Sequence, residues 1–582
     1  MELVDVTDSK SVDGDIVWVR VPPPAPKKSL LSLDKSDFFI LTIFSKKTEC
    51  DMKHSYKNYL INLIFPAFIF GSLTGVLTAL VVTLYKTCAK YVIQFSEIGY
   101  HFLKSHLYFV PIFIALLFGA AYLFTLIYSK NPTLRGGGIP TSIGVLRGIV
   151  TFKWLRNLIG VFFLSLSSFL IGVPLGNEGP SVQMGTAIGR GSVFASQKKH
   201  RAWDRYSMTG GACAGFSVAT GAPISGIMFA LEEAHQRISP MIIIVSSTSV
   251  MFAYITTEIL KSIFNINVAL FGELQLISLS IKDIWIPIAV GLAMGIWAVL
   301  FLRYYNLINK FFNKKLKKTS AKYKIFFVFL ITLLLGLCSY SFISTGHELI
   351  IALFDGKTAI YMLVLILIVR STLTLCANSN GVTGGMFVPI LALGAVLSSI
   401  LGKTMTALFG LGENYYTIIL VLGISACISG MMKMPLTAIL FALEALSCYE
   451  NILYVIIVCG ITFVVTEIFG AKSINDSVLE NRMKDLNDDT ALKVIDTFVT
   501  VQEDSFAVGK QIRDIFWPAN LFVLSLRHET HGAEIDEHGG TTISVGDILH
   551  VRYSTTDEEN TKAELTAIVG DQNYCENETD II

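Results

Sequence analysis

The stretch VPLGNEGPSVQMG, Val173 to Gly185, places a single carboxylate, Glu178, among glycines and a proline in a strongly apolar part of the chain. A charged side chain in such surroundings is energetically unfavourable unless it has a partner, a proton or a function. The composition around this stretch and the repetition of its pattern indicate which of these applies.

The whole chain has the composition of an integral membrane protein. Its 582 residues are 52% hydrophobic and only 16% charged, and the mean hydropathy is +0.59. A helix that crosses a bilayer needs about 20 apolar residues. Most of the apolar runs reach that length, and they are expected at 60–85, 108–128, 157–175, 240–262, 283–302, 325–344, 359–376, 416–432 and 452–469.

Shorter apolar segments, interrupted by glycine and proline, lie between these runs. We expect them to be half-helices or re-entrant segments, because broken backbone in a membrane is tolerated only where protein or a water-filled pathway covers it. These segments are 136–149, 178–195, 207–236, 384–402 and 434–447.

Charge and cysteine content exclude several classes of function. The net charge is +1 and the nine cysteines form no C-x-x-C pair, so we expect no nucleic acid partner, no metal and no cofactor. The seven lysines between 310 and 324 have no acid among them, which is typical of a cytoplasmic loop. Residues 1–56 read as a polar cytoplasmic tail and not as a signal peptide.

An internal repeat organises the apolar part of the chain. GNEGPSVQMGTAIG from Gly176 shares the spacing of its proline and glycine with GGMFVPILALGAVL from Gly384. APISGIMFALEEA from Ala222 similarly matches MPLTAILFALEAL from Met434, and each pair is separated by about 210 residues. Two halves with interrupted helices at matching positions are typical of a transporter with a binding site near the membrane midplane.

The interrupted segments begin with glycines, in RGGGIPTS from Arg135, GNEGPS from Gly176 and VTGGMFVP from Val382. Glycine-rich helix starts expose backbone N–H groups and the positive end of the helix dipole. Three of them in one repeat favour an anion site, whereas a cation pathway would favour carbonyl rings or several facing acids.

Three short motifs carry a specific family resemblance. GGGIP (Gly136–Pro140), GNEGP (Gly176–Pro180) and GMFVP (Gly385–Pro389) resemble, in order and spacing, the signature motifs of the CLC family of anion channels and anion/proton antiporters. The resemblance implies an all-α membrane fold, an inverted-repeat helical bundle with broken helices. It also implies a homodimer in the lipid bilayer, with one anion pathway in each subunit.

The resemblance assigns roles residue by residue. Glu178 is similar to the gating glutamate, and Glu233 to the internal glutamate that transfers protons in many antiporters. The positions that correspond to the anion site are Gly137, Gly138, Ile139, Gly179, Met386, Phe387, Val388 and Asn475, and Asn177 corresponds to a vestibule position.

The physics of Glu178 agrees with a gating role. An ionised carboxylate at a helix start can occupy an anion site, because it binds the same N–H donors as the anion. Burial disfavours its charged form while the helix dipole favours it, so it can exchange a proton for an anion. The alternative is a structural acid that caps a helix. Glu232, which aligns with Glu444 in the repeat, is expected to be architectural.

Three departures from the chloride-handling pattern point to a different anion. A serine is replaced by Gly137, a vestibule cation by Asn177 and a tyrosine by Asn475, which resembles the fluoride-exporting branch of the family. We therefore expect fluoride/proton antiport, with a chloride/proton antiporter or a voltage-gated-type chloride channel as alternatives. A membrane enzyme is disfavoured because the common catalytic motifs are missing.

The last hundred residues change character. Alternating stretches around KVIDTFVTV, LFVLSLRH and TTISVGDILHVRYS predict strands of a small cytoplasmic α+β domain, and the region resembles an RCK/TrkA-C regulatory module. The expected organisation is a tail at 1–56, a transport domain at 57–480 with repeat halves at about 60–262 and 283–470, the regulatory domain at 491–570 and a polar tail at 571–582.

Overall fold

The computed structural model describes residues 64–136, 138–194, 202–265, 271–272, 274, 276–486, 493–528, 534–536, 539–555 and 558–571. The predicted tail at 1–56, the predicted tail at 571–582 apart from its first residue, and the predicted site residue Gly137 lie outside these residues. Among the described residues, nine helices are long and apolar enough to cross a membrane, so the multi-pass prediction is confirmed.

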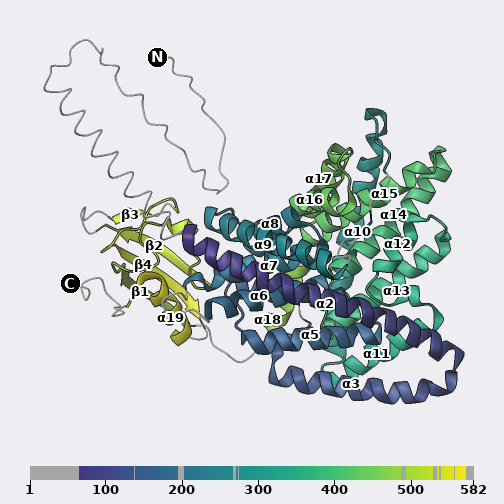
Figure 1. Cartoon of the computed structure of the whole chain (residues 1–582), viewed down its shortest axis with the longest axis horizontal. Helices are drawn as coiled ribbons and strands as arrows, with labels where there is room; N and C mark the ends of the chain where they lie inside the picture. Colours follow the sequence, from purple (N-terminus) through teal and green to yellow (C-terminus); the bar gives the residue numbers. More distant parts are fainter. Residues whose placement is uncertain are drawn as a thin grey trace, which may run out of the picture. The chain divides into compact units, whose positions relative to one another are not determined.

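Two series of eight helices follow each other along the chain (Figure 1). The first series is α2 Phe65–Ser105, α3 Val110–Lys130, α4 Ile139–Leu146, α5 Trp154–Ile171, α6 Glu178–Phe194, α7 Asp204–Thr220, α8 Pro223–Phe229 and α9 Pro240–Phe264. The second is α10 Trp285–Lys310, α11 Ala321–Cys338, α12 His347–Phe354, α13 Ile360–Ser379, α14 Phe387–Phe409, α15 Asn414–Met432, α16 Pro435–Leu446 and α17 Ile452–Ile468.

The two series pack in the same way, which confirms the repeat. In the first series α6 contacts α7 and α2 contacts α9, and in the second α14 contacts α15 and α10 contacts α17. The pairs α5–α6 and α13–α14 correspond, as do α4–α6 and α12–α14. The two halves meet directly where α8 contacts α16.

Glycine and proline break the chain at matching places. The end of α7 is Gly221, with φ of +73°, and the end of α15 is Lys433, with φ of +60°. Each left-handed residue is followed two positions later by a proline that starts the next helix, Pro223 or Pro435. Proline suits the first helical turn because it has no N–H to leave unpaired there.

One expected interruption is wrong. The segment 384–402 was expected to be too broken to cross a membrane, but α14 runs unbroken through 23 residues, Phe387–Phe409. Pro389 lies in its first turn, where proline does not remove an intrahelical hydrogen bond. Gly394 and Gly402 leave room for side chains of α15. A Cβ on Gly394 would lie 2.8 Å from Cys427 Cβ, and a Cβ on Gly402 would lie 3.0 Å from Tyr416 Cδ2.

The C-terminal part forms a small antiparallel sheet with one helix. The elements are α18 Ile474–Leu486, β1 Lys493–Thr500, β2 Leu521–Arg527, β3 Glu534–Asp536, β4 Ile548–Thr555 and α19 Glu558–Val569. The strand order is β1-β4-β2-β3. Its own core contains the buried Val499, Leu549, Val551 and Leu565, so the predicted α+β domain is confirmed.

Candidate functional site

Three glycine segments from the two halves meet in the middle of the bundle. Gly176 and Gly385 form an antiparallel bridge, in which each N–H donates to the other's carbonyl at 2.7 and 2.8 Å. A Cβ on Gly179 would lie 2.6 Å from Gly385 Cα, and one on Gly138 would lie 3.0 Å from Gly179 Cα. The backbones ahead of α4, α6 and α14 therefore touch, and no larger residue fits between them.

Glu178 is the first residue of α6 and lies at this junction. It is fully buried, and neither carboxylate oxygen has a hydrogen-bond partner within the described part of the chain. A Cβ on Gly176 would come within 2.6 Å of Glu178 Oε2, so the glycine leaves room for the carboxylate. Lys86 and His347 both act electrostatically on Glu178. A buried carboxylate without a well-formed hydrogen bond is costly as an ion, and the backbone N–H groups of Glu178 and Val388 offset part of that cost.

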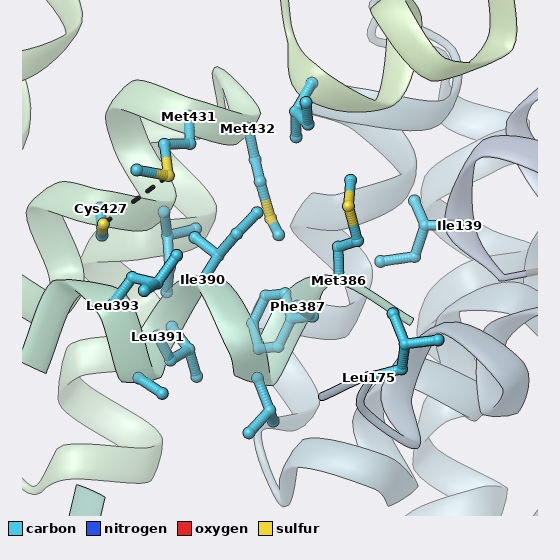
Figure 2. Close-up of a cluster of buried hydrophobic side chains, with 14 of the residues drawn as sticks. Ile139, Leu175, Met386, Phe387, Ile390, Leu391, Leu393, Cys427, Met431 and Met432 are labelled. Carbon is cyan, nitrogen blue, oxygen red and sulfur yellow. Dashed lines mark hydrogen bonds between the residues drawn. The ribbon is translucent and has the colours of Figure 1, made fainter. Parts of the chain in front are cut away.

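Phe387 begins α14 beside the same junction and is completely buried. Its ring packs edge-on against Phe216 and Phe441, with ring centroids 5.1 and 5.6 Å away. Figure 2 shows Ile139 and Leu175 of the first half on one side of Phe387 and Ile390 on the other. Met386 and Val388, which flank it, and Ile139 are also buried. Four of the predicted anion-site residues thus form one apolar wall: Ile139, Met386, Phe387 and Val388.

Gln183 stabilises the first glycine segment and was not predicted from the sequence. Its Oε1 accepts a hydrogen bond from the N–H of Gly138 at 2.5 Å, and its Nε2 donates to Thr133 O and Asn157 Oδ1. Gly138 has φ of +96°, a conformation that favours glycine. One signal was available: Gln183 is an amide in the otherwise small and apolar sequence after Pro180.

Glu233 lies in a short π-helix, Ala230–Ala234, and is almost fully buried. Its Oε1 accepts hydrogen bonds from Ser473 Oγ at 3.0 Å and from Asn475 Nδ2 at 2.9 Å. Arg147 donates to the carbonyls of Glu233 and Ala234 and pairs with Asp476. The structure therefore brings Glu233 together with Asn475, whose amide binds this carboxylate.

A large cavity of about 1080 Å³ lies between the two halves and is lined by Glu232, Ser473 and Asp476, whereas Glu233 lies behind this lining. Its lining contains basic and acidic side chains, and several of them are paired with each other, as in Lys433–Glu467 and Lys472–Glu480. The basic residues are Arg147, Arg237, Lys433 and Lys472, and the acidic ones are Glu232, Glu467, Asp476 and Glu480. The cavity reaches Ser473, whose hydroxyl donates to the Glu233 carboxylate.

Glu232 and Glu444 cap helices of the opposite half, as expected of an architectural pair. Glu232 accepts from the N–H groups of Leu436 and Thr437 at the start of α16, at 2.9 and 2.8 Å. Glu444 accepts from the N–H groups of Ile224 and Ser225 at the start of α8, at 2.7 and 2.9 Å. This reciprocity follows from the repeat and separates Glu232 from Glu233 in role.

Asn177, predicted to lie in a vestibule, is half-buried, and its carbonyl accepts from the N–H and hydroxyl of Ser181 inside α6. Within the described ranges no cluster of three or more His, Cys, Asp or Glu side chains could hold a metal ion.

Comparisons with known proteins identify the family and the fold. The family described as voltage gated chloride channel matches residues 119–467, and the TrkA-C domain family matches residues 497–566. The H(+)/Cl(-) exchange transporter ClcA of Vibrio parahaemolyticus serotype O3:K6 is 28% identical over 427 residues, which cover 72% of this chain and 90% of that relative. The ClcA of Klebsiella pneumoniae subsp. pneumoniae is 28% identical over 60% of this chain and 75% of its own.

Two solved structures share the fold. A slow cyanobacterial Cl-/H+ antiporter superposes with a TM-score of 0.65 and 24% identity, over 72% of this chain and 99% of its own. A CLC-type fluoride/proton antiporter gives a TM-score of 0.59 and 21% identity, over 70% and 96%. The chain belongs to the voltage gated chloride channel (CLC) family, carries a C-terminal TrkA-C domain, and is therefore a channel or secondary transporter and not an enzyme.

Proposed function

We propose that this protein exchanges an anion for protons across the membrane. The observation that carries the proposal is the buried Glu178, whose two oxygens have no hydrogen-bond partner in the described residues, at the meeting point of three glycine segments. Protonated, Glu178 is a neutral side chain that can leave the junction to an anion. Ionised, it competes with the anion for the same N–H donors, so one site couples the two fluxes.

Glu233 is proposed to pass protons between Glu178 and the large cavity. Its carboxylate faces two donors, Ser473 and Asn475, and lies beside Arg147. These contacts hold the carboxylate in one orientation, and the cavity provides the aqueous end of the path. Anion contacts are proposed for the glycine segments at Gly137, Gly138 and Gly179 and for the segment Met386–Val388.

Fluoride is the proposed anion. Gly137 offers no hydroxyl, Asn177 provides no cation, and the amide of Asn475 binds Glu233, so side-chain donors suited to chloride are missing. Each buried polar group left unpaired costs about 1–3 kcal/mol, which is enough to separate two halides. Chloride is the second candidate, because chloride/proton exchange is what the ClcA relatives are named for.

The function is tested with purified protein in liposomes, by following anion efflux and internal pH together. An anion gradient should drive protons uphill in the wild type, whereas a channel would show a reversal potential set by the anion alone. Glu178→Gln should abolish proton coupling. Glu233→Gln should slow proton movement and leave anion affinity unchanged, and the exposed Glu413→Gln is the matched control.

Two outcomes would contradict the roles proposed for Glu178 and Glu233, and a third would contradict the choice of anion. Proton uptake at the wild-type rate in Glu178→Gln would remove Glu178 from the coupling step. Equal losses of anion affinity and proton flux in Glu233→Gln would make Glu233 a structural acid. Fluoride efflux should exceed chloride efflux in the wild type, and equal rates would assign the chain to chloride/proton exchange.

The proposed assembly is a homodimer with both termini in the cytoplasm. The lysines between 310 and 324, which run from the last residue of α10 to the first turn of α11, support this orientation through the positive-inside rule. In right-side-out vesicles, protease added outside should leave a C-terminal tag intact. Cleavage of the tag would place the C-terminus outside and contradict the proposed orientation.

A further inference from the structure

A second cavity, of about 120 Å³, adjoins the large cavity and shares Leu479 and Met483 of α18 with it. It is enclosed by the loop before α4, by α10, by the end of α13 and by α18. Its polar lining consists of two guanidinium groups, a phenol, three amides and three aliphatic hydroxyls, from Arg135, Arg482, Tyr305, Asn309, Asn378, Asn481, Thr133, Thr141 and Ser379.

The lining of this cavity is positively charged and uncompensated. Arg135 and Arg482 line it, and no Asp or Glu does. No carboxylate lies within ion-pair distance of either arginine in the part of the chain that the structure describes. Two acids of α18 are paired elsewhere, Asp476 with Arg147 and Glu480 with Lys472.

Several polar groups at the cavity also have no partner. Asn378 Oδ1 and Ser379 Oγ are buried without a hydrogen-bond partner among the described residues. The Arg482 side chain donates to Thr141 Oγ1 and to the carbonyl of Gly136. Among the described residues the Arg135 backbone N–H donates to Pro132, and no hydrogen bond is recorded for the Arg135 guanidinium. Buried polar groups are normally paired. The cavity therefore presents the Ser379 hydroxyl and the two guanidinium groups as donors, next to one amide oxygen of Asn378 that can only accept.

We propose that this cavity binds a small oxyanion of the phosphate class. Guanidinium groups bind tetrahedral oxyanions through paired N–H···O bonds, which a spherical halide cannot use equally well. The Ser379 hydroxyl can donate to a third oxygen. The enclosed volume suits one such group, either free inorganic phosphate or the headgroup of an anionic lipid.

Arg482 connects this site to the transport segment. The same guanidinium that lines the cavity holds the carbonyl of Gly136 and the hydroxyl of Thr141, on either side of the start of α4. An oxyanion bound between Arg135 and Arg482 would therefore stiffen the segment that contains Gly137 and Gly138. The site itself needs no assumption about which anion is transported.

The test is thermal unfolding of the full-length protein in phosphatidylcholine nanodiscs, titrated with inorganic phosphate and with chloride at matched ionic strength. Phosphate should raise the melting temperature more than chloride does. Arg135→Gln should weaken the apparent phosphate affinity at least fivefold. Arg303→Gln, on an exposed position of α10 outside this cavity, removes the same charge and should bind as the wild type does.

A parallel arm with phosphatidic acid in the nanodisc distinguishes the sources. An Arg135-dependent stabilisation by the lipid, without one by free phosphate, identifies a headgroup as the oxyanion. If Arg135→Gln does not fold, Arg135→Lys replaces it and should show the same loss of affinity. The proposal is overturned if phosphate and phosphatidic acid stabilise the wild type no more than chloride, or if the Arg135 variants respond like Arg303→Gln.

Discussion

At the scale of single residues, the glycines of the three motifs are needed because the backbones approach too closely for a side chain, and not only because glycine is flexible. Gly179 Cα and Gly385 Cα approach so closely that a Cβ on either would overlap the other's backbone, at 2.6 to 2.9 Å. Neither residue has a positive φ among the described glycines. Their role is therefore to let two helix starts from opposite halves touch, which places the N–H groups of α6 and α14 around one point.

Gly179→Ala is expected to destabilise the protein and stop transport. The added methyl group would press on backbone, which cannot rotate away, and overpacking typically costs about 1–3 kcal/mol. Gly119→Ala is the matched control, because a Cβ there meets nothing within 4 Å in the middle of α3, and alanine is the better helix former. Thermal unfolding of both variants in detergent measures the difference, and equal melting temperatures would show that the junction is loose.

Much of this residue-level site could be predicted, because glycines and a buried acid leave a local pattern. The starts of α6 and α14 lie where GNEGP and GMFVP indicated. The partner of Asn475 could not be predicted, since Glu233 is 242 residues away and only the π-helix aims its carboxylate at α18. Gln183 was missed for the same reason: its partners Gly138 and Asn157 come from other elements.

At the scale of helices, the two halves hold each other by exchanging caps. Glu444 supplies both oxygens to the start of α8, to two N–H groups and the hydroxyl of Ser225. Glu232 does the same for α16 with Leu436 and Thr437. Neither helix has a cap from its own preceding residue, which is Ala222 or Met434. The acid of each half therefore replaces the N-cap that the other half lacks.

Glu444→Ala should destabilise the contact between α8 and α16. Loss of a helix cap usually costs about 0.5–2 kcal/mol, and the N–H groups left unpaired add to it. Glu450→Ala, on an exposed side chain shortly after α16, is the control. Thermal unfolding should separate the two variants, and hydrogen exchange should increase at the first amides of α8 only in Glu444→Ala. Unchanged exchange there would mean that water replaces the carboxylate.

Element lengths were less predictable than element positions. The proline and glycines of 384–402 suggested a broken segment, but Pro389 in the first turn and glycines packed against α15 are compatible with one long helix. The sequence pattern alone does not distinguish a glycine that ends a helix from one that receives a neighbouring side chain. Packing between α14 and α15 determines that the glycines of this segment receive neighbouring side chains and do not end the helix.

At the scale of the whole molecule, the C-terminal domain contains a lysine in an unfavourable position. Burial lowers the pKa of Lys510 from 10.5 to about 8. Its Nζ lies 3.8 Å from the centroid of the Phe506 ring and donates to the Phe506 carbonyl. Below pH 8 the folded and unfolded states both carry the charge, and the burial penalty is fully present. Between pH 8 and 10.5 the folded state loses the proton first, so stability rises with pH.

Lys510→Met should therefore raise the melting temperature of the domain at pH 7 and reduce its increase between pH 8 and 10. The methionine keeps most of the apolar stem and removes the charge. Lys562→Met, which removes the ion pair with Glu558 on α19, should keep the wild-type pH dependence. Melting curves of the full-length protein at several pH values measure both, and an unchanged slope in Lys510→Met would contradict the assignment.

The same domain packs against the segments that hold Glu233. Tyr206 of α7 donates to the carbonyl of Asp514 at 2.5 Å and accepts from the N–H of Phe516 at 3.2 Å. The Phe516 ring lies 4.5 Å from the His235 ring, two residues beyond Glu233. Arg205 pairs with Glu564 on α19. A change in the C-terminal domain can thus reach the π-helix through aromatic packing.

Phe516→Ala is expected to loosen this contact and slow proton flux while leaving the anion site intact. Phe516 is 8% exposed, and the Arg237 guanidinium lies 4.5 Å from its ring centroid. Truncation therefore removes both packing and a cation–π contact. Replacing a buried phenylalanine with alanine typically lowers the free energy of unfolding by about 3–5 kcal/mol. Phe522→Ala, on a 66% exposed side chain of β2 in the same domain, is the control. Hydrogen exchange across residues 203–209 and 512–517 reports the contact, and the liposome assay reports the fluxes. Faster exchange with unchanged proton flux would show that the domain is attached to the Glu233 segment without controlling it, whereas a loss confined to proton flux would assign the TrkA-C domain a part in setting the rate of coupling.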